Sequence, residues 1–486
     1  MGLRNRLKAG QFNQHIWFIV VWLFISALFQ FHKIVFLQPL SVHQGAQVDR
    51  ASIARNYFKV SMNFFEPRMM ETGTKNGITP CEFPLVNYSV ALCYKLFGFN
   101  TFWYRFLMWI LMGIGLWAAF DLIFKLTDSI LAALFISCAW FSSSVLAYYT
   151  ANFLPDVASL GFLLLALRRW IIYTQNPSTK AIVWFTIFAS LACLIKITSL
   201  IFIIALGLIS LYKFVKSRKK PILLISVFIT FTLVIVWYIY CQWLERQVGG
   251  SYFLMQMVLP SSIPELKEWF HIFYSNWFTQ IYNLPQWYFI AFGLASIYFV
   301  KNTGEYRGFT VISFVGIIGF YLLMAGQFRY HDYYVITLLP VFLFLMVYAF
   351  KTLHQINKIL AYSIVSTVCI WGIIDAKNNV RLRFKKDNYW YQTFFEPSDF
   401  VGVDIWLTEN GISQDKKVLA AFDPNPNTLL YFLNRRGYRT FDHSLTYIQE
   451  KIEKTDGVVT NDSTKFFAMY PAVSYTHLTL PTNREV

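Results

Sequence analysis

The chain has 486 residues, of which 56% are hydrophobic and 14% are charged. Soluble domains hold about 45–50% apolar and about 25% charged residues, so this composition excludes an ordinary soluble protein. The formal net charge of +16 does not indicate a nucleic-acid partner, because the lysines and arginines stand in small clusters between apolar runs, as in inner-membrane proteins. The six cysteines form no CxxC pair, and no disulfide framework is expected.

Eleven apolar runs are predicted to cross the membrane as helices, each near the roughly 20 residues that a bilayer requires. They lie near residues 17–37, 101–121, 129–147, 156–172, 181–195, 198–214, 221–241, 286–300, 308–325, 333–350 and 359–375. The N-terminal MGLRNRLKAG precedes the first run without a small-residue cleavage site, which predicts an uncleaved helix. An odd number of spans places the two termini on opposite sides.

The distribution of basic residues indicates how the protein is oriented in the membrane. With the N-terminus inside, the cytoplasmic segments hold most of the loop lysines and arginines, including Arg218, Lys219 and Lys220 of KFVKSRKK. This asymmetry follows the positive-inside rule. The loops 38–100 and 242–285 and the tail after residue 375 are therefore predicted to face the periplasm or exterior of a bacterial inner membrane.

The 38–100 loop is predicted to contain two interfacial helices. One begins with DRASIARNYF after Val48, and the other is the apolar segment FPLVNYSVALCYKLFGF at 83–99. Counting 83–99 as a span would place the later lysine clusters outside, so it is expected to lie along the membrane surface. Its Asn87 and Lys95 are then expected among the headgroups.

The composition changes after residue 375. A β-like run, a turn-rich DPNPN and a helix-like segment in KKVLAAFDPNPNTLLYFLNRRGYRTFDH predict a small α/β unit. The expected domains are thus a membrane domain over 1–375 and an extracytoplasmic α/β domain over 376–472. The end, VSYTHLTLPTNREV (473–486), resembles translated sequencing-adapter sequence. It is expected to be a non-native tail, so that the α/β domain is truncated.

Polar residues gather at the predicted outer ends of the helices, and charged residues at membrane depth mark sites by default. They are Asp49, Glu82 of CEFP, Arg105, Asp156 of NFLPD, Lys196 of LACLIKITSL, and Arg329, His331 and Asp332 of GQFRYHDYY. Simpler roles stay open: Arg105 and Lys196 could snorkel to headgroups, Asp49 and Asp156 could cap helices, and His331 could be structural. Their common side favours a site.

These residues carry a resemblance. The pattern D-[RE]-x-x-[AS]-x-A-R-N-x-F after a first helix, then [EH]-x-P-[LV] and KLFGFNTFWYR, resembles the GT-C glycosyltransferases that use polyprenol-phosphate sugars. It is most similar to family 39, the dolichyl-phosphate-mannose–protein mannosyltransferase and aminoarabinose transferase-like group, over roughly residues 15 to 350. The resemblance implies an all-α polytopic GT-C protein with a small C-terminal α/β domain. Two departures stand out: Arg50 where the group has glutamate, and Phe83 where the aminoarabinose transferase has lysine.

The implied reaction moves a sugar from a polyprenyl-phosphate donor to an envelope acceptor. A carboxylate serves as general base, and Asp49 is expected in that role because Arg50 and Arg55 are expected to be too exposed to neutralise it; Glu82 and Asp156 are further catalytic candidates. Lys196 and Arg329 are expected to bind the leaving phosphate, with Arg105 in reserve. One base without a second nucleophile favours inversion. A divalent metal on Glu82 and His331 stays open, since two ligands are too few.

Two other classes remain. A transporter or flippase of lipid-linked glycans would place its charges near the bilayer midplane, with broken helices in two related halves, and no internal repeat is found. A membrane-anchored binding module would act through its outer tail alone. The sequence leaves the sugar open, and the acceptor could be a lipid, a glycan or a protein.

Overall fold

The computed structural model describes residues 2–217, 221–253, 258–301, 304–440, 444–460, 463–470 and 477–479. Arg218, Lys219 and Lys220 of the predicted cytoplasmic cluster lie outside the described residues. The chain forms two compact units. Unit 1 consists of Met1–Phe36, Arg105–Tyr238 and Gln256–Lys385, and unit 2 of Leu37–Tyr104, Ile239–Met255 and Lys386–Val486.

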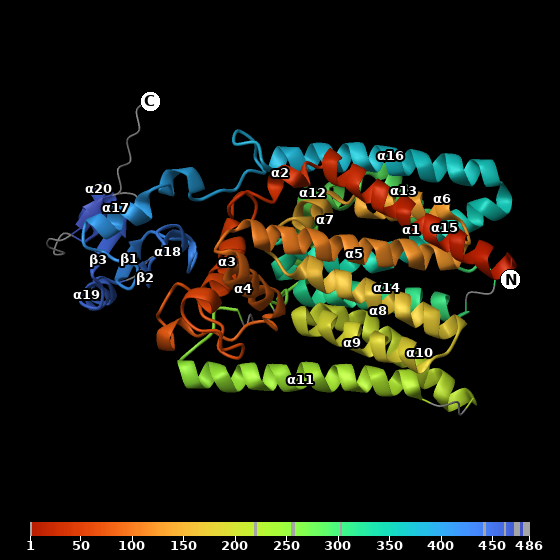
Figure 1. The fold of residues 1–486 in the computed structure, drawn as a ribbon, viewed down its shortest axis with the longest axis horizontal. Coiled ribbons are helices and arrows are strands. Elements are labelled where there is room, and N and C mark those ends of the chain that lie inside the picture. Colours follow the sequence, from red (N-terminus) through yellow and green to blue (C-terminus); the bar gives the residue numbers. More distant parts are fainter. Residues whose placement is uncertain are drawn as a thin grey trace. The chain divides into compact units, whose positions relative to one another are not determined.

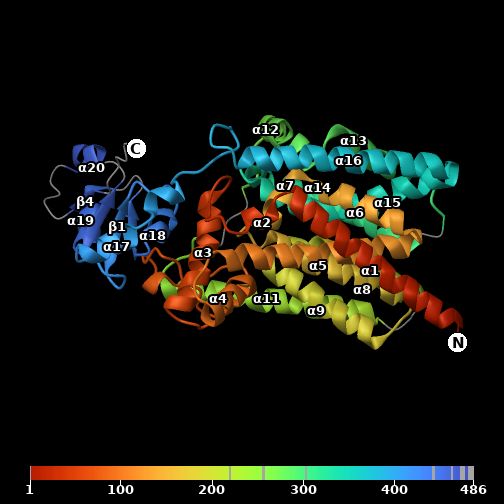
Figure 2. The ribbon, with the colours of Figure 1, turned by 45° about the horizontal axis from the view of Figure 1, so that its top comes forward.

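Unit 1 is helical, and both ribbon views show its long helices running alongside one another (Figures 1 and 2). Its elements are α1 (Gly2–Leu28), α2 (Phe31–Ile34), α5 (Phe102–Thr127), α6 (Ile130–Phe141), α7 (Ser144–Thr150), α8 (Asp156–Gln175), α9 (Thr179–Ile195), α10 (Leu200–Ser217), α11 (Ile222–Val248), α12 (Ile263–Ile281), α13 (Leu284–Ser296), α14 (Gly304–Phe328), α15 (Leu339–Ile356) and α16 (Lys358–Arg383), with 3-10 turns η2 (Ile197–Ser199) and η3 (Asp332–Leu338). The first residues of α5 and the last of α11 belong to unit 2. Helix α8 packs on α9, α10 on α14, and α13 on α15.

Every predicted span falls on helical segments, with 129–147 divided between α6 and α7, which confirms a polytopic membrane protein. Among the described residues, seven helices are long and apolar enough to cross a bilayer, and α6 with α7 forms an eighth candidate bent by 86°. The spans predicted near 17–37, 181–195 and 286–300 correspond to the shorter α1, α9 and α13. The segment Asp332–Ile356 is 94% buried, against 33% for α16. A helix that is apolar all round belongs in the interior, so α15 is the core of unit 1.

Helix α12 was not predicted, because its sequence IPELKEWFHIFYSNWFTQI mixes charged and aromatic residues. Its start has a local cause: the Ser262 side chain accepts a hydrogen bond from the backbone N–H of Glu265, and a proline occupies the first turn. Both features favour helix initiation.

The first part of unit 2 contains the two helices predicted in the 38–100 loop, α3 (Gln44–Lys59) and α4 (Leu85–Phe97), with a 3-10 turn η1 (Lys75–Gly77) between them. Val86, Val90 and Tyr94 of α4 are buried one turn apart, and α4 packs on α3. Leu96 and Phe97 are exposed. The prediction for Asn87 is wrong: its side chain is buried and accepts a hydrogen bond from the Tyr104 hydroxyl at 2.9 Å.

The C-terminal part of unit 2 is an α/β fold with a parallel sheet of four strands in the order β2-β1-β3-β4. Its elements are η4 (Pro397–Phe400), α17 (Val403–Glu409), β1 (Lys417–Ala421), α18 (Thr428–Phe432), β2 (Arg436–Thr440), α19 (Leu445–Ile452), β3 (Gly457–Thr460), α20 (Ser463–Met469) and β4 (His477–Thr479). Helices α17, α18, α19 and α20 lie around the sheet (Figure 2). Leu419, Val458 and Phe466 form its core. Strand β4 falls within the segment 473–486, whose non-native origin stays a prediction.

Candidate active site

Asp49 lies inside helix α3, beyond its first turn. The helix begins at Gln44 with His43 as N-cap, so Asp49 is not a helix cap. Its Oδ1 accepts a hydrogen bond of 2.7 Å from the side-chain amide of Asn427. The Asn427 Oδ1 in turn accepts hydrogen bonds from the backbone N–H groups of Met70 and Glu71, at 2.9 and 3.2 Å. These two bonds fix the amide, so its N–H group must point at Asp49.

The environment of Asp49 shifts its protonation toward neutral pH. Burial raises the pKa of Asp49 to about 6, against the opposing effects of the Asn427 hydrogen bond and of Arg50 and Arg439. Burial likewise raises the pKa of Asp423 to about 7. Asp423 accepts backbone hydrogen bonds from Asn425 and Leu429 at the start of α18. A carboxylate with a pKa near the working pH suits proton transfer.

Glu82 forms an ion pair with Arg50 rather than capping helix α4. Both Glu82 oxygens lie near one Arg50 nitrogen, at 2.9 and 3.1 Å, while the N-cap position of α4 is Pro84. The Arg50 guanidinium also stacks on the ring of Phe253, 4.7 Å from its centre. Because Arg50 pairs with Glu82, it does not form a salt bridge with Asp49, and the Asp49 carboxylate can still accept a proton.

In unit 1 the structure brings together Asp156 and Lys196. Asp156 is the first residue of α8 and Lys196 ends α9, and the packing of these helices places the carboxylate 3.2 Å from the ammonium group. The Lys196 ammonium also lies 5.6 and 5.5 Å from the ring centres of Tyr333 and Tyr334. Both charged side chains are buried, so the alternative in which Lys196 snorkels to headgroups does not fit.

The other predicted residues of unit 1 have separate surroundings. Arg105 is fully buried, donates a hydrogen bond of 2.6 Å to the carbonyl of Ala151 and stacks on Phe153, so it does not snorkel. Arg329 stacks on Trp269 at 4.3 Å. His331 Nδ1 lies 3.3 Å from the Gln327 carbonyl, the contact expected of a structural histidine.

Unit 1 also contains an ion pair that the sequence did not predict. Arg383 at the end of α16 donates to Asp332 at 2.7 Å, and the Tyr149 hydroxyl donates to the other Asp332 oxygen at 2.5 Å. Both charged side chains are fully buried. Arg383 was overlooked because the last span was expected to end at residue 375. Asn427 and Asp423 were also missed, since DPNPN indicates only a turn.

A metal site finds no support in this geometry. Among the described residues, no group of three or more His, Cys, Asp or Glu side chains could hold a metal ion. Glu82 is engaged by Arg50. No chemical step is therefore assigned to a metal.

Comparison with known proteins identifies the fold. The family model described as dolichyl-phosphate-mannose-protein mannosyltransferase matches residues 79–240, and no curated protein matches the sequence significantly. The crystal structure of ArnT from Cupriavidus metallidurans bound to undecaprenyl phosphate is similar with a TM-score of 0.62 at 12% identity, over 93% of this chain and 90% of that chain. The apo state gives 0.60 at 11% identity, over 92% and 89%. The chain has a GT-C fold.

A more distant similarity concerns the Archaeoglobus fulgidus oligosaccharyltransferase in complex with Zn and sulfate. It has a TM-score of 0.50 and 13% identity, and the match covers 86% of this chain and 61% of that chain. At such identities the similarity concerns the fold. Since ArnT matches nearly end to end, the fold includes both the helical part and the C-terminal α/β part.

Proposed function

We propose that this protein is a membrane glycosyltransferase that moves a sugar from a polyprenyl-phosphate donor to an acceptor of the cell envelope. The reaction is assigned to the outer face of a bacterial inner membrane. Two findings support the donor class: the fold resembles that of ArnT, whose structure holds undecaprenyl phosphate, and a mannosyltransferase family model matches part of the chain.

The observation that carries the proposal is the Asp49 carboxyl, oriented by Asn427 at 2.7 Å and shifted by burial to a pKa of about 6. In the proposed reaction, the Asp49 carboxylate accepts the proton of the acceptor hydroxyl. The acceptor oxygen attacks the anomeric carbon as the bond to the phosphate oxygen breaks, and polyprenyl phosphate leaves with the bonding electrons. This single displacement inverts the anomeric configuration.

Lys196 and Arg329 are the proposed ligands of the leaving phosphate. Negative charge grows on its oxygens as the bond breaks, and cations already held in place stabilise that charge without reorganisation. Aromatic contacts hold Arg329 and Lys196. Asp156 holds the Lys196 ammonium group in place through their ion pair, and Arg105 is assigned a structural role because it is fully buried.

The test compares glycolipids and envelope glycans by mass spectrometry in cells with the intact protein, without it, and with Asp49→Asn. Asparagine keeps the shape and can hydrogen-bond, but it cannot take up the acceptor proton. We expect one glycan species to gain a sugar only with the intact protein. General-base loss costs about a hundred- to ten-thousand-fold in rate, so Asp49→Asn should lack that species although it folds and inserts.

A fully active Asp49→Asn protein would exclude Asp49 as the base and move the search to Glu82 and Asp156. Identical glycan profiles with and without the intact protein, together with altered export of a lipid-linked glycan, would instead favour a flippase.

A further inference from the structure

Unit 2 contains a cavity of about 380 Å³ between the C-terminal part of α3 and the segments around α17 and α18. We call it the α3–α18 pocket. It is lined by Gln38, Arg55, Lys59, Phe99, Pro397, Phe400, Val401, Asp404, Tyr431, Phe432 and Asn434. Its volume lies within the range of about 300–1,000 Å³ that is typical of small-ligand sites. The lining does not include Asp49 or the residues described around it, namely Asn427, Asp423, Arg50 and Glu82.

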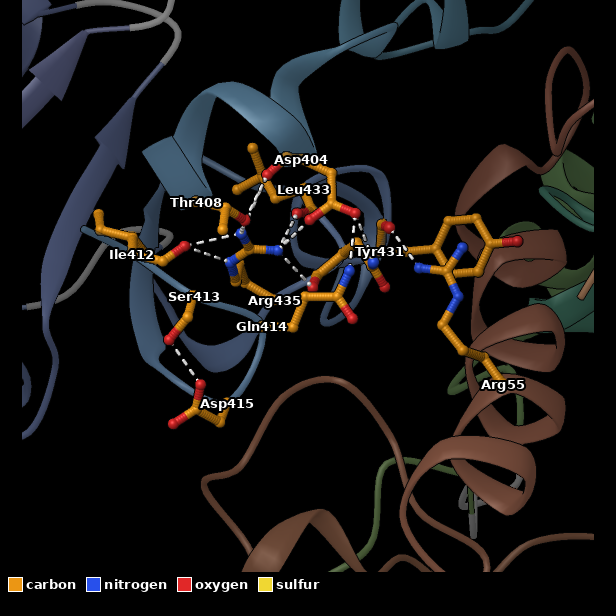
Figure 3. Close-up of polar contacts among 11 residues, drawn as sticks. Arg55, Asp404, Thr408, Ile412, Ser413, Gln414, Asp415, Tyr431, Leu433 and Arg435 are labelled. Carbon is orange, nitrogen blue, oxygen red and sulfur yellow. Dashed lines mark hydrogen bonds and ion pairs between the residues drawn. The ribbon is translucent and has the colours of Figure 1, made fainter. Parts of the chain in front are cut away.

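One wall of the pocket carries two cations. Arg55 and Lys59 stand four residues apart on α3 and so share one face of the helix. The expectation that Arg55 is exposed is wrong, since only 7% of it is accessible. Its guanidinium donates to the Tyr431 carbonyl at 2.6 Å and lies 3.7 Å from the centre of the Tyr431 ring. Figure 3 shows Arg55 reaching from α3 to Tyr431.

Arg55 has unused hydrogen-bonding capacity. Its buried Nε has no hydrogen-bond partner, and in the described part of the chain no carboxylate pairs with it. An arginine presents five N–H donors, and a buried cation without a counter-charge costs several kcal/mol in general. This guanidinium is therefore suited to an anion that enters the pocket.

The acid of the pocket cannot supply that counter-charge. Asp404 forms an ion pair with Arg435 and accepts hydrogen bonds of 2.9 Å from Asn434 and Gln414. Although burial acts to raise it, the Arg435 and Asn434 hydrogen bonds hold the pKa of Asp404 below its ordinary value. Figure 3 shows the Arg435 guanidinium at the centre of this network. Asp404 is thus ionised and already neutralised, which leaves Arg55 and Lys59 as the uncompensated charges.

Aromatic rings supply the rest of the surface. Phe400 and Phe432 stack with their ring centres 5.2 Å apart, and Phe99 adds a further ring 4.8 Å from the Arg55 guanidinium. The flat faces of such rings carry partial negative charge and pack against the C–H face of a sugar ring. A site with aromatic walls and two cations therefore combines recognition of a sugar with recognition of an anion.

We infer that the α3–α18 pocket binds a sugar that carries a carboxylate or a phosphate, as part of the acceptor glycan. Arg55 and Lys59 contact the anionic group, and Phe400 and Phe432 contact the ring. The assignment to the acceptor rests on the proposed transferase function, whereas binding itself does not.

The experiment measures binding by calorimetry to the full chain reconstituted in nanodiscs, without a donor. The probes are trigalacturonic acid and glucose 6-phosphate for the two anionic groups, maltotriose as the neutral sugar, and inorganic phosphate. We expect saturable binding of at least one anionic sugar and none of maltotriose. Charge-assisted hydrogen bonds contribute about 1.5–3 kcal/mol, so the exposed Lys59→Gln should weaken binding about tenfold or more. Lys75→Gln, an equal change of charge outside the pocket, should not.

Phe400→Leu separates the sugar from the anion, because it removes the ring and keeps an apolar side chain. This substitution should weaken the binding of the anionic sugar and leave the binding of inorganic phosphate unchanged. Equal affinity for inorganic phosphate and the anionic sugars, equal affinity for maltotriose, or unchanged binding in Lys59→Gln would each overturn the proposal. Anionic-sugar binding in a protein that transfers no sugar would support the pocket while contradicting the proposed function, so the two can fail separately.

Discussion

At the scale of single residues, Asp49 should govern the pH dependence of transfer. Its pKa is raised to about 6, and a base acts only when ionised. Transfer should therefore rise with pH up to about 6 and level off above it. Asn427→Ala removes a hydrogen bond that lowers this pKa. The rising limb of the pH–rate profile should therefore move to higher pH. The initial rate of transfer, measured from pH 4.5 to 8.5, reports both.

Other charged groups near Asp49 also influence its pKa, so the Asn427→Ala variant needs a control. Arg50 and Arg439 lower its pKa, Glu82 raises it, and Asp423 is electrostatically coupled to it. Asn410→Ala changes an exposed asparagine of the same unit and should leave the limb in place. A merely structural role for Asn427 would lower the rate equally at every pH, and an unchanged limb in Asn427→Ala would contradict the orientation of Asp49 by this amide.

The proposed phosphate ligands allow a second prediction at this scale. Lys196→Ala and Arg329→Ala each remove a cation whose hydrogen bonds to the phosphate contribute about 1.5–3 kcal/mol. Each should lower kcat/KM for the polyprenyl-phosphate donor by about ten- to a hundredfold. Lys377→Ala, an exposed lysine on α16, is the matched control. Wild-type donor turnover in both variants would mean that other residues hold the phosphate.

Some residues of the candidate site could be predicted from the sequence and others could not. Asp49 was identified from its place after the first span and Lys196 from its charge within an apolar run. Asn427 could not be found, because its contact to Asp49 joins segments 378 residues apart, and a turn-rich DPNPN carries no sign of it. Arg55 was misjudged because exposure depends on which face of α3 is covered, and the covering residue Tyr431 comes from the C-terminal part of the chain.

At the scale of elements, hydropathy located the long helices well, since length and apolar content are what membrane insertion requires. It failed where helices are short or mixed, as in α12. It also misplaced the end of α16, because the polar residues of DAKNNVRLR suggested a loop. That extension positions Arg383 against Asp332, a contact that depends on the packing of two helices.

The buried Asp332–Arg383 pair should matter for stability. Arg383→Met removes the cation that pairs with the buried Asp332 and should lower the free energy of unfolding by about 3–5 kcal/mol. In the double variant Asp332→Asn, Arg383→Met no charge is stranded, so part of that loss should be recovered. Thermal unfolding in detergent measures both, with the exposed Arg381→Met as control. Equal destabilisation by Arg381→Met would contradict a specific role of the pair.

At the scale of the whole molecule, the parallel sheet explains why the C-terminal segment takes part in the candidate site. Ligands of open α/β sheets bind beyond the carboxyl ends of the strands, and Asp423 and Asn427 follow β1 directly. The same segment provides Tyr431 and Phe432 of the α3–α18 pocket. One loop–helix segment after β1 therefore serves both the proposed base and the proposed acceptor site. A chain that ends before residue 423 should lack both sugar transfer and the binding of anionic sugars.

The membrane topology provides the last prediction. An inside N-terminus and eleven crossings place the segment around Lys220 in the cytoplasm and the α/β part outside. Because α16 continues to Arg383, the outer reporter belongs after Asp387, beyond the helix. Alkaline phosphatase should be active after Asp387 and inactive after Lys220, and green fluorescent protein should show the reverse. The side predicted for each reporter depends on α4, because every later loop would change sides if 83–99 crossed the membrane. Reporters in reversed order would contradict either the inside N-terminus or an interfacial α4. Reporters on the same side would contradict the five spans predicted between residues 220 and 387.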